Sequence, residues 1–297
     1  MRRSPSLLRP RMAVQLAQLP EVERLSPACI RILGGNPGKF TLQGTNTYLL
    51  GTGPNRLLID TGEGRLSWIA ALRRTLHEER ASIAGVLITH WHHDHQGGIR
   101  QLLEVWPNTK VYKHQPETGQ LEIVDGQKFT VPGASLTAVH TPGHTDDHLV
   151  FLWDEEYAMF TGDNVLGQGT AVFEDLATYL GSLEKMRSLC KGRAYPGHGP
   201  VLADGPGKIA EYIRHRQQRE EQVIHTLRPK NSAFGAVSKK KGWTPMELVK
   251  VIYQDVPENL HQAAAGGVVQ ILRKLQDEGK VAVEGGDRWR LTDRSAL

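Results

Sequence analysis

The feature that most constrains the fold of this chain is a histidine-rich segment placed directly after an apolar run. The run Ile83–Ile88 predicts a strand covered on both faces, and the segment Thr89–His95, with the sequence THWHHDH, follows it at once. In α/β folds, ligands and chemistry gather at the carboxyl ends of such strands. We therefore expect an α/β protein in which this segment forms a ligand loop at the edge of a sheet.

The loop contains metal-ligand side chains at close spacing. His90, His92, Asp94 and His95 offer three imidazoles and one carboxylate. Nitrogen and oxygen ligands of this kind suit Zn²⁺, with iron or manganese as alternatives. Since one ion does not easily use all four groups, we expect His90 and His92 to face one ion and Asp94 and His95 to face a neighbouring one.

Three further candidate ligands follow apolar segments downstream. His144 lies in the motif TPGHT, Asp163 in TGD and His198 in PGHG. Asp163 is the natural bridging ligand, because a carboxylate can offer one oxygen to each of two ions. The sequence thus predicts a dinuclear site with seven ligands and two Zn²⁺ ions per chain.

In this order, HxHxDH, TPGHT, TGD and PGHG resemble the motifs of the metallo-β-lactamase superfamily. The resemblance implies an α/β (α+β) fold, a four-layer αββα sandwich, and implies that Asp60 supports the ligand loop without binding metal. His148 follows the TPGHT motif. We expect it either to contact substrate or to pack behind the ligands, and we include it with Asp94 and Asp163 as a catalytic candidate.

Such a site predicts hydrolysis. Two divalent ions lower the pKa of a bridging water and stabilise the charge that develops on a phosphoryl or acyl oxygen. Asp94 would orient the bridging hydroxide and exchange its proton. The ligands alone leave open whether phosphorus or a carbonyl carbon is attacked.

Composition and length divide the rest of the chain. The 297 residues, 39% hydrophobic and 23% charged, are ordinary for a soluble protein, and no apolar run is long enough for a membrane span. Two cysteines in so long a chain favour a reducing compartment. We predict four parts: a leader (1–20), a catalytic domain (21–229), a linker (230–243) and a winged-helix-like domain (244–297).

The leader and one charged helix each allow two interpretations. Residues 1–12 hold four Arg and no acidic residue, which resembles a mitochondrial transit segment, although Met12 could instead open a shorter chain. The run Arg214–Arg219 lies in a predicted long helix from residue 207 to about 228. Its charged spacing is typical of a solvated helix face.

The C-terminal segment has the pattern of a winged helix. Thr244, Pro245 and Glu247 form a capping-box sequence for a helix over 246–254. Further helices are expected at 259–264 and 268–278, followed by a hairpin over 280–291 with a Gly-Gly turn. Such modules bind nucleic acid or only pack against a neighbour. As substrate-binding candidates we take four residues here, Lys250, Arg273, Lys274 and Trp289, together with Asn46 near the predicted cleft.

Several longer stretches, among them TLQGTNTY at 41–48, TPGHTDDH at 141–148 and VFEDL at 172–176, resemble the animal mitochondrial β-lactamase-like endoribonucleases. That resemblance implies hydrolysis of single-stranded RNA by a monomer or homodimer in the mitochondrial matrix, with the cytoplasm as the alternative location. Thioester hydrolases of the glyoxalase-II-like and polyketide-releasing kinds share the same ligand set and are the alternative. Neither Cys29 nor Cys190 lies where a cysteine ligand is needed, which argues against antibiotic hydrolysis.

Overall fold

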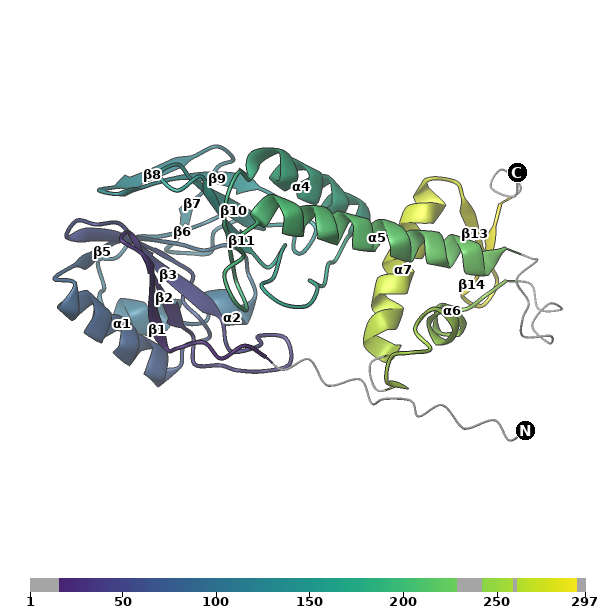
Figure 1. The fold of residues 1–297 in the computed structure, drawn as a ribbon, viewed down its shortest axis with the longest axis horizontal. Coiled ribbons are helices and arrows are strands. Elements are labelled where there is room, and N and C mark those ends of the chain that lie inside the picture. The colour runs from purple at the N-terminus through teal and green to yellow at the C-terminus, as the bar shows by residue number, and fades with distance from the viewer. Residues whose placement is uncertain (1–15, 229–241, 259–260, 293–297) are drawn as a thin grey trace, which may run out of the picture.

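The computed structural model describes residues 16–228, 242–258 and 261–292. A two-sheet body and a smaller C-terminal module lie at opposite ends of an elongated molecule, and one long helix, α5 (Gly205–Leu227), joins them (Figure 1). Most of the predicted leader and linker falls in residues 1–15 and 229–241, outside the described residues. In the described part of the chain, no helix is both long and apolar enough to cross a bilayer.

Two sheets form the centre of the body. The seven-stranded sheet runs in the order β1 to β7 and becomes parallel from β4 onward, whereas the five-stranded sheet has the order β12-β11-β10-β9-β8. The strands of the first sheet are β1 (Val22–Ser26), β2 (Cys29–Leu33), β3 (Asn46–Leu50), β4 (Asn55–Ile59), β5 (Ser82–Leu87), β6 (Val111–Lys113) and β7 (Leu121–Glu122). Those of the second are β8 (Lys128–Val131), β9 (Ala134–His140), β10 (Leu149–Trp153), β11 (Ala158–Gly162) and β12 (Ala194–Pro196).

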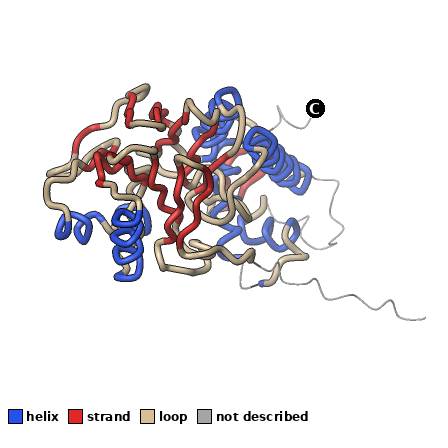
Figure 2. Tube along the Cα trace, turned by 60° about the vertical axis from the view of Figure 1, so that its left-hand side comes forward, coloured by secondary structure: helices blue, strands red, loops and turns tan. Residues whose placement is uncertain are grey.

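Helices cover the outer face of each sheet (Figure 2). On the first sheet lie α1 (Leu66–Glu78), the one-turn α2 (His93–Gln96) and α3 (Ile99–Val105); on the second lie α4 (Leu176–Leu189) and α5 (Gly205–Leu227). One apolar cluster fills the space between the two sheets, and a second joins the first sheet to α1 and α3. The predicted four-layer αββα sandwich is confirmed.

The C-terminal module contains α6 (Pro245–Ile252), α7 (His261–Asp277) and a hairpin of β13 (Val281–Glu284) with β14 (Arg288–Leu291). The predicted capping box is present: the Thr244 side chain accepts from the Glu247 amide and the Glu247 carboxylate accepts from the Thr244 amide. The prediction of two separate helices after α6 is wrong, because α7 runs without a break from 261 to 277. Its Ala, Val and Leu residues suit a single helix, and the pair Gly266-Gly267 does not interrupt it.

The C-terminal half of α5 supplies the third helix of this module. Val223 and Leu227 of α5 share one apolar cluster with Leu248 of α6, Leu272 of α7 and Trp289 of the hairpin. The same cluster extends to α4 and the five-stranded sheet. The module therefore packs onto the body through a continuous apolar core.

Candidate metal centre

The ligand loop divides in two because its backbone changes direction within the motif. Extended backbone follows β5 as far as His92, which is the N-cap of the short helix α2. Asp94 and His95 then lie in the first turn of that helix. This change brings Asp94 and His95 beside His198, whereas His92 lies beside His144, so the two pairs have different partners, as the sequence predicts.

The first group of ligands comprises His90, His92 and His144. The distances are 3.0 Å from His90 Nε2 to His92 Nδ1 and 3.1 Å from His144 Nε2 to His92 Nδ1. A tetrahedral zinc site with bonds of about 2.0–2.1 Å separates neighbouring ligand atoms by about 3.3 Å. Three imidazoles at this spacing fit one such ion.

The second group comprises Asp94, His95 and His198. His198 Nε2 lies 3.1 Å from Asp94 Oδ2 and 3.3 Å from His95 Nε2, and His95 Nε2 lies 3.4 Å from Asp94 Oδ2. These distances between ligand atoms also match a tetrahedral site. The donor set thus fits a second ion.

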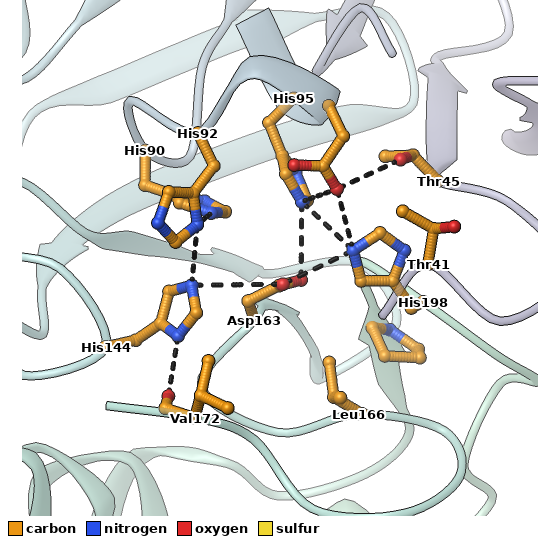
Figure 3. Close-up of polar contacts among 12 residues, drawn as sticks. Thr41, Thr45, His90, His92, His95, His144, Asp163, Leu166, Val172 and His198 are labelled. Atoms are coloured by element: carbon orange, nitrogen blue, oxygen red, sulfur yellow. Dashed lines mark hydrogen bonds and ion pairs between the residues drawn. The ribbon is translucent and has the colours of Figure 1, made fainter. Parts of the chain in front are cut away.

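Asp163 lies between the two groups (Figure 3). Its Oδ2 is 3.8 Å from His144 Nε2 and 3.3 Å from His198 Nε2, and its Oδ1 is 3.4 Å from His95 Nε2. Within the described residues, the buried Oδ1 accepts no hydrogen bond. A buried carboxylate oxygen is costly to leave unpaired, so this position is suited to a bound cation. All seven predicted ligands therefore converge on one site.

Hydrogen bonds behind the ligands fix which imidazole nitrogen faces the site. His144 Nδ1 donates to the carbonyl oxygen of Val172 at 2.7 Å, and His95 Nδ1 donates to Asp60 Oδ2 at 2.7 Å. Asp60 also accepts from the Thr89 amide at 2.8 Å, and Thr89 Oγ1 lies 2.9 Å from His90 Nδ1. Because the Nδ1 atoms of His90, His95 and His144 are each hydrogen-bonded, the Nε2 lone pairs of these three ligands point into the site. The expected supporting role of Asp60 agrees with this geometry.

Thr89 is a functional residue that sequence reasoning missed. Its hydroxyl donates to the Asp60 carboxylate, and it stands between that carboxylate and His90. Asp60 and Thr89 together therefore support one ligand in each group, His95 and His90. A threonine between a buried strand and the first ligand was the only available signal.

Asp163 and the second group hold carboxylates and imidazoles that change one another's pKa values. Burial alone would lower the pKa of His198, but the Asp163 and Asp94 carboxylates outweigh it and raise this pKa to about 9. Burial likewise opposes the change in Asp163, whose pKa is held well below its usual range by His198 and His95. In the first group, burial lowers the pKa of His92 to about 4, with a contribution from His144. A cation entering the second group would replace protons that its carboxylates attract.

Two glycines in the motifs provide room for the site. A Cβ atom at Gly162 would lie 2.6 Å from His148 Nε2, and one at Gly197 would lie 2.4 Å from Asp163 Oδ1 and 2.9 Å from His95 Cε1. Any side chain at these positions would displace a site residue. The glycines of TGD and PGHG are thus explained by close approach.

The structure places His148 behind the ligands. It is buried, its Nε2 accepts from the Asp163 amide at 3.1 Å, and its Nδ1 lies 3.2 Å from Thr141 Oγ1. Burial lowers the pKa of His148 well below its usual value, so the ring is neutral and can accept that bond. Of the two expected roles, packing behind the ligands agrees with this geometry, and the expectation that His148 contacts substrate does not.

Two predicted substrate contacts have structural roles instead. Asn46 is buried in β3, and its amide nitrogen donates to the carbonyl oxygens of Pro196 and Gly199 at 2.8 Å each, which holds the loop that carries His198. Trp289 is 5% exposed within the core of the C-terminal module, so its ring is not available to stack on a base.

The three predicted basic contacts of the C-terminal module differ from one another. Lys274 is paired with Glu220 of α5 at 2.8 Å and with Glu278, so its charge is already compensated. Lys250 and Arg273 are exposed. The five substrate-binding candidates therefore do not form one surface.

Comparison with known proteins identifies the family. Residues 40–198 match the metallo-beta-lactamase superfamily, and residues 244–289 match the beta-lactamase associated winged helix domain. The chain belongs to the metallo-β-lactamase superfamily. Two solved structures have a similar fold. A metallo-beta-lactamase family protein from Thermus thermophilus has a TM-score of 0.71 and 23% identity, and the match covers 91% of this chain and 100% of that one. A beta-lactamase domain protein from Burkholderia ambifaria has a TM-score of 0.76 and 16% identity, and the match covers 91% of this chain and 93% of that one.

Among its relatives, this metallo-β-lactamase superfamily member is similar to fungal proteins along almost its whole length. It is 48% identical to the lactamase-like protein adaB of Aspergillus niger, covering 91% of this chain and 87% of that one. It is 46% identical to an atrochrysone carboxyl ACP thioesterase of Aspergillus chevalieri (93% and 90%) and 44% identical to one of Claviceps purpurea (92% and 89%). These relatives agree with the thioesterase alternative rather than with the endoribonuclease resemblance.

Proposed function

We propose that this protein is a metal-dependent thioester hydrolase that releases an acyl group from an acyl carrier protein. The observation that carries the proposal is the 44–46% identity to atrochrysone carboxyl ACP thioesterases, which includes the C-terminal module as well as the catalytic body. The set of seven ligands, with spacing that suits two zinc ions, supports hydrolysis as the reaction class.

When bound, two zinc ions would lower the pKa of a water molecule and polarise the thioester carbonyl. Asp94 is the candidate for proton transfer: its side chain is 23% exposed, whereas Asp163 is more enclosed. Oδ1 of Asp94, the oxygen that is not used as a ligand beside His95 and His198, would accept the proton of the attacking water as the new C–O bond forms. After the C–S bond breaks, the same carboxyl would return that proton to the departing thiolate.

The surroundings of the ligands support an apolar acyl group. Trp91 lies between two ligands in the sequence and is 44% exposed, and Val172, which accepts the His144 hydrogen bond through its backbone, is 59% exposed. Large apolar groups left exposed beside a polar site are typical of ligand contacts.

Hydrolysis of single-stranded RNA, which the sequence first suggested, has weaker support. Two of the residues predicted to contact RNA are occupied by the protein itself, since Trp289 is buried and Lys274 is paired with Glu220. A mitochondrial location and an RNA partner remain predictions from the sequence. We therefore place thioester hydrolysis first.

The test uses zinc-loaded full-length protein and an acyl thioester of an acyl carrier protein. We expect release of the free carrier thiol by the wild type and none by Asp163→Asn, which removes the bridging charge but keeps the size of the side chain. Labelled single-stranded RNA is incubated in parallel. Internal RNA cuts by the wild type alone, with the thioester left intact, would replace this proposal with the nuclease.

A further inference from the structure

A cavity of about 400 Å³ lies where the body meets the C-terminal module. Its walls come from the loop at 170–173, from α5 and from the helices of the module. None of the seven ligands lines it, so it is distinct from the metal centre. It nevertheless borders that centre, because Val172 lines the cavity and accepts the hydrogen bond of His144 Nδ1 at 2.7 Å.

The α5 wall of the cavity carries two guanidinium groups. Arg216 lies over the Phe173 ring at 4.7 Å and donates to the carbonyl oxygen of Ala171 at 2.7 Å. Arg219 lies over the Tyr253 ring at 4.4 Å and donates to Gln222. Over the described residues, neither guanidinium forms an ion pair with a carboxylate, whereas the nearby Lys274 does. Two uncompensated cations at a cavity between domains favour an anionic ligand.

Polar groups and open space beside the arginines point the same way. His215 also lines the cavity, and its buried Nδ1 has no hydrogen-bond partner in the part of the chain that the structure describes. Opposite α5, helix α7 presents Gly266 and Gly267. A Cβ atom at either glycine would meet nothing within 4 Å, so no protein packing accounts for two adjacent glycines, each of which costs a helix about 1 kcal/mol relative to alanine.

We infer that this cavity binds the phosphate of the phosphopantetheine arm that carries the acyl thioester. This inference rests on the proposed function, since an acyl carrier protein presents its thioester on such an arm. Arg216 and Arg219 would pair with the phosphate, and the apolar side chains of Val172, Phe173 and Tyr253 would contact the pantetheine chain. The loop at 171–173 connects the two sites: Arg216 holds it on the cavity side and His144 on the side of the metal centre.

The experiment compares two substrates that differ only in the phosphate, S-benzoyl phosphopantetheine and S-benzoyl pantetheine. The variant is Arg219→Gln, and the matched control is Arg214→Gln, an exposed position on the same helix that does not line the cavity. We expect Arg219→Gln to lower the ratio of kcat/KM between the phosphorylated and phosphate-free substrates about tenfold, the lower end for loss of a charged hydrogen bond. Arg214→Gln leaves the ratio unchanged. An unchanged ratio in Arg219→Gln would overturn the inference.

A second variant blocks the cavity without removing a charge. Gly267→Leu fills open space and raises helix propensity, so the protein should fold. Titration calorimetry of the zinc-loaded wild type with phosphopantetheine should detect binding that both Gly267→Leu and Arg219→Gln weaken about tenfold or more. Equal affinity of Gly267→Leu and the wild type would contradict the assignment.

Calorimetry also separates this inference from the proposed function. If the wild type hydrolyses no thioester, the proposed function fails, whereas binding of phosphopantetheine still decides what the cavity holds. If the wild type hydrolyses both substrates but binds no phosphopantetheine, the proposed function stands and the cavity assignment fails. Single-stranded RNA that displaces phosphopantetheine from the wild type, with a loss of RNA affinity in Arg219→Gln, would assign the cavity to RNA phosphate and overturn the inference.

Discussion

The hydrogen bonds of Asp60 allow a quantitative prediction for one half of the metal centre. Its two oxygens accept from His95 Nδ1 at 2.7 Å and from the amide and hydroxyl of Thr89 at 2.8 and 2.9 Å. In Asp60→Asn one oxygen becomes an NH₂ group. If the NH₂ group takes the place of Oδ2, it faces the donor His95 Nδ1–H, and if it takes the place of Oδ1, it faces the Thr89 amide N–H. In either case two donors meet and one hydrogen bond to the carboxylate is lost.

The expected loss follows from that count. Losing one hydrogen bond to a charged group costs about 1.5–3 kcal/mol, which corresponds to roughly 10- to 100-fold in zinc affinity. Supporting residues of histidine ligands show effects of about the same size. The loss should fall mainly on the ion held by Asp94, His95 and His198, because only this group contains the ligand that Asp60 contacts directly.

Competition with a chromophoric chelator measures the affinity of each zinc equivalent. We expect one equivalent in Asp60→Asn to be weakened about 10- to 100-fold and the other to change less. Asn suits the backbone at position 60, where φ is +58°, so a fold defect is not expected. Asp154→Asn, at an exposed turn, is the control. Unchanged affinity of both equivalents in Asp60→Asn would refute the role assigned to this carboxylate.

Three further predictions test the motifs, the metals and the C-terminal module. Gly197→Ala places a Cβ 2.4 Å from Asp163 Oδ1 and should lower bound zinc below two equivalents by elemental analysis, whereas Gly181→Ala, with nothing within 4 Å, should retain both; equal zinc contents would contradict the steric argument. Removing zinc with a chelator should lower the thermal midpoint and re-addition should restore it, because ligands that bind only the folded state stabilise it; an unchanged midpoint would count against tight binding. Thr244→Ala removes the cap of α6 and should cost about 1 kcal/mol in denaturant unfolding followed by Trp fluorescence; no change would show that the cap is dispensable.

The sequence was sufficient for the ligands because their chemistry and spacing are local. His90 to His95 lie on one loop, and each of the other three ligands follows a recognisable apolar strand. The capping box of α6 was readable for the same reason, since all its atoms come from residues 244–247.

Roles that depend on tertiary neighbours could not be predicted in this way. Trp289 looked available for stacking, but its burial depends on α5, α6 and α7 together. The charged run on α5 read as a solvated face, whereas Arg216 and Arg219 line a cavity whose opposite wall comes from residues more than thirty positions away. Similarly, the burial of Asn46 depends on the loop of His198, which lies far along the chain.

The continuity of α5 has a consequence for how this protein loses structure. Because the apolar cluster around Val223 and Leu227 belongs to both the body and the module, removing residues after 229 would leave an apolar helix face in water. The two parts should melt in a single cooperative transition, and a truncated chain would reveal more about aggregation than about substrate preference. The unit that unfolds cooperatively therefore extends across the change in amino-acid composition near residue 230.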